Sequence, residues 1–182
     1  SSCFPDSGEN IKDGAQMRDH YLEILATGLY GVLIEKFFIA KGSGGNGKSL
    51  INELALKSLG NYAYKLPSSV ITSDIKEGGN PQMANLHKKR LAIVQEPTTR
   101  NLVSSATIKE ITGCKDLNVR MNHSNKCGIT LCQTLIGEVN VTLKFDCIDG
   151  GIGRRGDITE FTAKAVEKHI YDTYEDKTGL II

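Results

Sequence analysis

The chain has 182 residues and a formal net charge of +1, with 40% hydrophobic and 24% charged residues. This composition is ordinary for a soluble globular protein, and the length predicts one domain with a sizeable core. Because the chain is nearly neutral, it cannot bind nucleic acid through an overall positive charge. Any contact with nucleic acid must therefore come from a local basic patch.

The cysteines form no recognisable framework. They are odd in number, none is spaced as C-x-x-C and no histidine pair completes a zinc pattern. Reduced intracellular thiols are therefore expected. No signal peptide and no apolar run near 18 residues is found, so secretion and membrane insertion are unsupported.

The first half of the chain alternates loop, helix and strand patterns. Residues 1–15 are predicted as loop, and Met17 to Leu29 as an amphipathic helix that ends near Gly28 or Gly31. Short strands are predicted over 36–40 and 62–66. Between them a helix is predicted over 49–60, with Leu50, Leu54 and Leu59 on one side and Gly60 as its stop.

The second half continues this alternation. The predicted elements are a buried strand (90–96), a helix capped at both ends (104–113), a hairpin (117–121 and 127–131), two strands (134–140 and 157–161) and a helical tail (162–175). Together they predict an α/β domain with a central, mostly parallel sheet flanked by helices. We expect a leading loop and helix (1–35), a core (36–161) and a C-terminal helical segment (162–182), with both ends cut from a longer chain.

The stretch "GSGGNGKS" matches the phosphate loop G-x-x-x-x-G-K-[ST]. Glycines let backbone N–H groups approach a bound anion at a helix N-terminus, which predicts a nucleoside triphosphate site. Lys48 is expected at the β- and γ-phosphates, and Ser49 at Mg²⁺. A glycine-rich surface turn is the alternative, but a turn needs no Lys-Ser pair. The predicted binding residues are Gly42, Ser43, Gly44, Gly45, Asn46, Gly47, Lys48, Ser49 and Leu50.

Hydrolysis needs a carboxylate at the end of a buried strand beside this loop, to coordinate Mg²⁺ or to orient water. Glu96 follows the apolar run 91–94 and is the predicted acid. Gln95 precedes it, where many NTPases have an aspartate, and its amide can assist. A solvated glutamate at a strand end is the alternative interpretation.

Three further residues are candidates for contact with the γ-phosphate. Asn140 ends the strand 134–140 and can hold the attacking water, although asparagine also forms turns at such places. Arg154 and Arg155 lie in a glycine-rich loop, from which an arginine can reach a triphosphate on a neighbouring subunit. A solvated basic pair is an equally weighted alternative.

The ordered stretches "GSGGNGKS", "KKRLAIVQEP", "IKEITGCKDLNVR", "TLIGEVN" and "GGIGRRGDITEF" resemble the superfamily 3 helicases. The resemblance is greatest to primase-helicases of phages, plasmids and large DNA viruses, including the poxvirus type. It spans about residues 17–161. Asn46 fits the family's phosphate loop, and Glu96 fits its lone strand-end glutamate. A Thr-Gly turn at Thr112 also fits, with one extra residue before Asp116.

The resemblance implies an AAA+-like core that assembles into hexameric rings and translocates along single-stranded or forked DNA with ATP and Mg²⁺. Asn140 would be the sensor. One of Arg154 and Arg155 would act across the subunit interface, with Arg155 favoured. A primase domain in the full-length chain, and action in a host cytoplasm or nucleus or in a bacterial cytoplasm, are also implied.

The hairpin would then project into the ring channel and contact the DNA backbone through His123 and Lys126. A solvated hairpin is equally compatible with so thin a basic patch.

The sequence thus predicts an ATP-hydrolysing DNA helicase motor domain from a viral or mobile-element replication protein. Two alternatives stay open. One is a small-molecule kinase with a phosphate loop. The other is a nucleotide-binding, ring-forming module that hydrolyses little because Gln95 replaces an acid.

Overall fold

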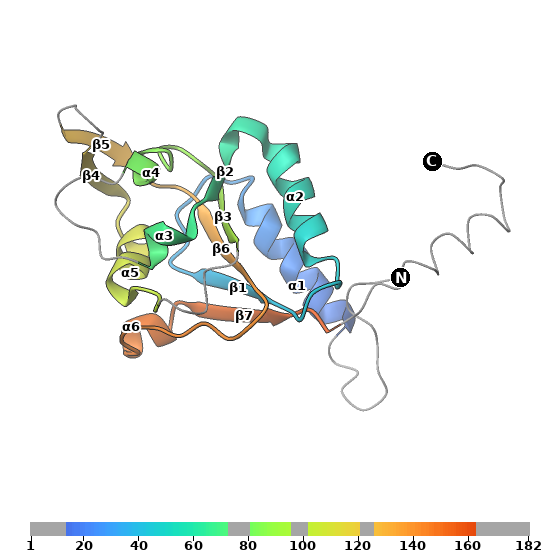
Figure 1. Cartoon of the computed structure of the whole chain (residues 1–182). Helices are drawn as coiled ribbons and strands as arrows, with labels where there is room; N and C mark the ends of the chain where they lie inside the picture. Colours follow the sequence, from blue (N-terminus) through green and yellow to red (C-terminus); the bar gives the residue numbers. More distant parts are fainter. Residues whose placement is uncertain (1–13, 73–80, 96–101, 121–125, 163–182) are drawn as a thin grey trace, which may run out of the picture.

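The computed structural model describes residues 14–72, 81–95, 102–120 and 126–162 (Figure 1). Within these ranges, no helix is long and apolar enough to cross a membrane.

A five-stranded parallel sheet forms the centre of the structure. Its spatial order is β2-β3-β6-β1-β7, and every neighbouring pair runs parallel. The strands are β1 (Phe37–Lys41), β2 (Ala63–Leu66), β3 (Leu91–Gln95), β6 (Thr134–Val139) and β7 (Gly156–Glu160). The predicted α/β fold with a mostly parallel sheet is confirmed.

Helices cover both faces of the sheet. Helices α1 (Gly14–Thr27) and α2 (Lys48–Leu59) lie on one side, and α3 (Ser68–Ile71), α5 (Ser105–Gly113) and α6 (Gly150–Gly153) lie on the other (Figure 1). Because side chains alternate along a strand, Phe38 and Ala40 of β1 pack with α1, whereas Phe37 and Ile39 pack in the opposite core. Burial on both faces explains why these strands read as continuous apolar runs.

Helix α1 forms where predicted, but it begins at Gly14, inside the stretch predicted as loop, and Leu29 of the predicted pattern lies beyond its end and is 63% exposed. Tyr21 and Ile24 are buried, and the helix ends at Thr27, one residue before Gly28. Helix α2 also forms where predicted, but its expected apolar side is only partly correct. Leu50 and Leu54 are 67% and 56% exposed, whereas Leu59 packs against the core together with Ile51, Asn52, Ala55 and Leu56.

The predicted hairpin is present as a separate two-stranded antiparallel sheet of β4 (Asp116–Arg120) and β5 (Lys126–Thr130). Its base is anchored by main-chain hydrogen bonds, one from Lys88 N to Thr130 O at 2.9 Å. The sequence analysis did not predict several short helices. These are α3, α4 (Pro81–Ala84), α6 and the 3₁₀ helix η1 (Gly60–Tyr62). The predicted helical tail (162–175) lies almost wholly outside the described residues.

Core packing around position 137 of β6 leaves no room for a side chain larger than that of glycine. A Cβ atom there would lie 2.7 Å from Cζ of Phe37, which packs against the strand from the side of α5. We predict that Gly137→Ala lowers the free energy of unfolding by about 1–3 kcal/mol, because the ring must shift in a packed core. Urea titration followed by circular dichroism measures this value.

Gly150→Ala is the matched control, since a Cβ at Gly150 meets nothing within 4 Å. It should change the free energy of unfolding by less than about 1 kcal/mol. Equal stability of Gly137→Ala and the parent chain would contradict the packing described here.

Candidate triphosphate site

The glycine-rich loop leaves the carboxyl end of β1 and leads into α2. Gly42 N donates to Val139 O of the neighbouring β6 at 3.0 Å. A Cβ on Gly42 would lie 1.9 Å from Asn46 Nδ2, so no other residue fits there. The main chain then turns through left-handed conformations at Gly44, Gly45 and Gly47 (φ 93°, 64° and 78°). This backbone can present its N–H groups to an anion at the start of a 12-residue helix.

Asn46 braces the loop from within. Its Nδ2 donates to Phe161 O at 3.1 Å, and its Oδ1 accepts from Lys48 N at 3.3 Å. The side chain is buried, at 3% exposure. The loop is therefore tied to the segment that follows β7.

The structure places Lys48, Ser49 and Asn140 close together. The Lys48 side chain is buried, and its Nζ donates to Asn140 Oδ1 at 3.0 Å. Ser49 Oγ donates to Glu138 Oε1, and the same oxygen lies 3.8 Å from Lys48 Nζ.

Glu138 was missed by the sequence analysis. It is 4% exposed, lies near the carboxyl end of β6 and points to the same side as Asn140, two residues on. Its Oε2 accepts from Asn52 Nδ2 at 3.3 Å and from Gln95 Nε2 at 3.4 Å. The available signal was a single carboxylate inside an otherwise uncharged strand, two residues before the candidate sensor.

A tyrosine supports this cluster from α1. Tyr21 O–H donates to Asn52 Oδ1 at 2.5 Å, and the ring packs edge-on against Phe161. Burial raises the pKa of the Tyr21 phenol, the hydrogen bond to Asn52 lowers it, and the charge of Glu138 raises it further. The net direction is upward, so the phenol stays a hydrogen-bond donor at neutral pH.

The predicted catalytic acid lies just beyond the described part of the chain. Gln95 is the last residue of β3, and Glu96 lies outside the described residues. Gln95 itself contributes an amide to Glu138, as noted above.

The two arginines have different surroundings at the far edge of the sheet. Arg155 is 7% exposed, and its guanidinium donates to Thr112 Oγ1, Gly151 O and Glu35 Oε2 at 3.1, 3.0 and 3.3 Å. The Arg154 side chain is 64% exposed and pairs with Glu35 at 3.1 Å.

Strand register places both arginines away from the loop of their own subunit. Phe37 N, at the start of β1, donates to Arg155 O at 2.8 Å, whereas the glycine-rich loop follows Lys41 at the other end. Five residues of strand separate the two ends by roughly 16 Å at about 3.3 Å per residue.

The Thr-Gly pair of the family resemblance, expected in a turn, forms the C-terminal end of α5 and contacts Arg155. Thr112 accepts from Arg155 Nε, and a Cβ on Gly113 would lie 2.9 Å from Arg155 Nη2. The pair therefore provides both the hydrogen-bond acceptor and the space that hold Arg155 in place.

The expected DNA contacts fall largely outside the described residues. His123 lies outside them, and Lys126 is the first residue of β5.

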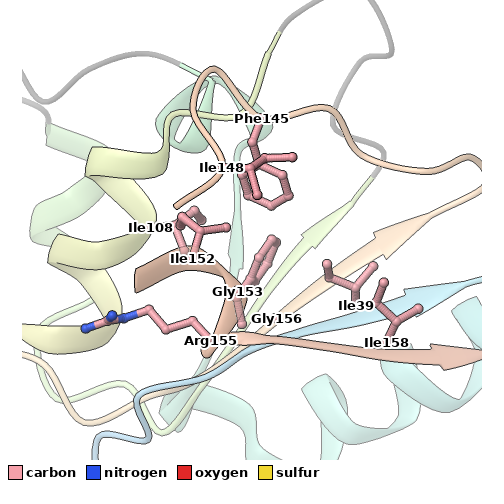
Figure 2. A pocket seen from close by; sticks show the side chains of 10 residues that line it. Ile39, Ile108, Phe145, Ile148, Ile152, Gly153, Arg155, Gly156 and Ile158 are labelled. Carbon is pink, nitrogen blue, oxygen red and sulfur yellow. The ribbon is translucent and has the colours of Figure 1, made fainter. Parts of the chain in front are cut away.

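An apolar pocket of about 230 Å³ lies between α5, α6 and the strands β1 and β7 (Figure 2). The Arg155 side chain borders it, with its guanidinium directed away from the apolar lining and towards α5 (Figure 2). None of the residues of the glycine-rich loop lines this pocket. It is therefore not placed to present a small substrate to a triphosphate bound at that loop.

The donor set fits a magnesium-bound triphosphate. The described residues contain no group of three or more His, Cys, Asp or Glu side chains that could hold a metal alone. Mg²⁺ in nucleotide sites needs no such cage, because it takes one or two protein oxygens besides phosphates and water. Ser49 Oγ supplies such an oxygen beside a buried lysine, and Glu138 accepts the Ser49 hydroxyl from behind.

The fold and this loop define a P-loop NTPase-type α/β domain, with the loop between the first strand of the core and its following helix. No family model matches the chain.

The chain is similar to viral replication proteins. It is 28% identical over 94% of its length to primase D5 of Fowlpox virus (strain NVSL). It is 31% identical over 62% of its length to a protein of Frog virus 3 (isolate Goorha) provisionally named helicase 022R. The chain spans 23% and 11% of these relatives, respectively. The predicted resemblance to viral primase-helicases is confirmed.

Solved structures share the fold. The apo structure of the NrS-1 C-terminal region superposes with a TM-score of 0.61 at 19% identity, covering 79% of this chain and 34% of that one. A JCV helicase bound to a small molecule superposes with a TM-score of 0.53 at 14% identity, covering 82% and 42%.

The different surroundings of the arginines lead to a stability prediction. Arg155→Ala should lower the free energy of unfolding by about 2–3 kcal/mol, because it leaves a cavity and removes buried hydrogen bonds. Arg154→Ala should cost about 0–1 kcal/mol, because its ion pair is exposed. Urea unfolding of both variants checks the difference, and equal losses would refute the assignment of Arg155 as the buried, bonded partner.

Proposed function

We propose that the chain is the ATP-driven DNA helicase motor of a viral or mobile-element replication protein. The observation that supports this most is the convergence of Lys48, Ser49, Glu138 and Asn140 on one glycine-rich loop. The relatives named primase and helicase supply the link to DNA.

The proposed chemistry is phosphoryl transfer from ATP to water. Main-chain amides of the loop and the Lys48 ammonium bind the phosphates, while Asn140 contacts the γ-phosphate end. Ser49 holds Mg²⁺, which neutralises charge developing on the phosphate oxygens. Glu96 orients and polarises the attacking water from the end of β3.

An arginine of one subunit completes the site of its neighbour in this proposal. Both arginines lie at the amino ends of β1 and β7, too far from their own loop to act in cis. Arg155 is held by Thr112 and Gly151, whereas Arg154 has an exposed guanidinium with a single exposed ion pair. We therefore assign the trans role to Arg154, in place of the initial preference for Arg155.

The proposed assembly is a hexameric ring on single-stranded or forked DNA, with the hairpin tip and its His123 and Lys126 in the channel. Contacts with the DNA backbone do not depend on base sequence. A translocating motor requires this independence of sequence. An accompanying primase domain and action inside an infected cell follow from the same proposal.

The alternatives gain less support. No residue of the loop lines the apolar pocket of Figure 2, so this pocket does not supply the substrate site that a small-molecule kinase needs there. The ATPase measurement described next distinguishes the motor from a ring-forming module that hydrolyses little ATP.

ATPase rate with and without single-stranded DNA tests the proposed function. We expect DNA-stimulated turnover that Glu96→Gln removes by at least about 100-fold, since the water loses its base. Lys48→Ala should weaken nucleotide binding by calorimetry. A DNA-independent rate would favour the kinase, and nucleotide binding with negligible turnover would favour the slow module.

Mixing two inactive variants tests the trans arginine. Arg154→Ala alone should lose on the order of 1,000-fold in turnover. When Arg154→Ala is mixed with an equal amount of Lys48→Ala, the mixed rings should regain about a quarter of the parent rate. One subunit interface in four then pairs an intact loop with an intact arginine. Mixtures as inactive as the separate variants, under conditions where sizing shows rings, would refute trans action by Arg154.

A further inference from the structure

We propose that Glu138 is a positioning residue for magnesium at the glycine-rich loop, and that it supplies the negative charge which Gln95 cannot. This inference rests on the proposed function, because it assumes a magnesium-bound triphosphate at the loop. It adds a carboxylate from β6 to a site whose expected acid lies at the end of β3.

The two oxygens of Glu138 have separate tasks. Oε2 accepts from the amides of Asn52 and Gln95, at 3.3 and 3.4 Å. These two donors fix the orientation of the carboxylate. Oε1 consequently faces the loop, where it accepts from Ser49 Oγ and lies 3.8 Å from Lys48 Nζ.

The hydroxyl of Ser49 explains why this orientation matters. A serine oxygen that binds a metal through a lone pair must direct its proton elsewhere. Glu138 Oε1 accepts that proton, which leaves the lone pairs of Ser49 Oγ available to the metal. Partners of this kind behind a ligand commonly determine metal affinity.

Strand register places the carboxylate of β6 beside Gln95 of β3. Strands β3 and β6 pair in parallel, and Gln95 is directly opposite Glu138. An acidic residue at position 95 would therefore lie next to the present carboxylate. The carboxylate at position 138 therefore supplies a negative charge next to the amide at position 95.

The burial of Glu138 supports a charge-dependent task for its carboxylate. Glu138 is 4% exposed, and burying a carboxylate is costly unless it is paired and hydrogen-bonded. Among the described residues, the cationic side chain next to Glu138 is Lys48. In the proposed function the Lys48 ammonium binds phosphate. A divalent cation would then compensate the charge of Glu138.

The experiment measures how strongly Mg²⁺ tightens nucleotide binding. A fluorescent ADP analogue is titrated into the 182-residue chain at a series of Mg²⁺ concentrations and in excess EDTA. For Glu138→Gln we expect the Mg²⁺ concentration giving half-maximal tightening to rise about 10- to 100-fold. Nucleotide affinity in EDTA should stay within about 3-fold, because the phosphate-binding amides and Lys48 are unchanged.

Two further variants make the test specific. Glu53→Gln removes a half-exposed carboxylate from the same helix, which pairs with Lys57 among the described residues, and should behave as the parent chain. The double variant Gln95→Glu with Glu138→Gln moves the acid to β3 and should recover most of the Mg²⁺ dependence. It also serves as the test if Glu138→Gln alone fails to fold.

The outcomes separate the two proposals. An unchanged Mg²⁺ dependence in Glu138→Gln, an equal loss of affinity with and without Mg²⁺, or a double variant without recovery overturns the role of Glu138. If Lys48→Ala binds the nucleotide as tightly as the parent chain, the proposed function itself fails, whatever Glu138→Gln shows.

Discussion

The parallel pairing of β1 with β6 is the constraint on which the candidate site depends. It sets Lys41 opposite Val139 and allows Gly42 N to donate to Val139 O. The glycine-rich loop therefore begins beside the strand that bears Glu138 and Asn140. Because side chains two residues apart share a strand face, both reach the first turn of α2. A shift of one residue in this register would direct both side chains to the opposite face.

The same sheet separates the two halves of the proposed catalytic apparatus. Parallel strands place the glycine-rich loop at their carboxyl ends and the arginines at the amino end of β7. A site that needs both must therefore combine the two edges from different copies of the chain. The surroundings of the two arginines also differ, because Arg155 is buried and bonded within its own subunit whereas the Arg154 side chain is exposed.

The sequence was sufficient for the features that depend on local pattern. The loop glycines, the parallel sheet and the meeting of Lys48 with Asn140 could all be predicted, because motif and strand ends specify them. The buried side of α2 was predicted only in part, since hydrophobic spacing cannot show that a helix packs through Asn52 at a polar site. Glu138 was missed because its burial depends on donors from α2 and β3, which only the tertiary structure brings together.

The central claim is that the glycine-rich loop, Lys48 and the carboxyl end of β6 form one triphosphate site. A crystal structure of the chain with Mg²⁺ and a non-hydrolysable ATP analogue tests it most directly. The account predicts phosphate oxygens within hydrogen-bonding distance of Lys48 Nζ and the loop amides, with Asn140 at the γ-phosphate and the metal at Ser49. A nucleotide bound in the apolar pocket near Arg155, with the loop unchanged, would contradict it.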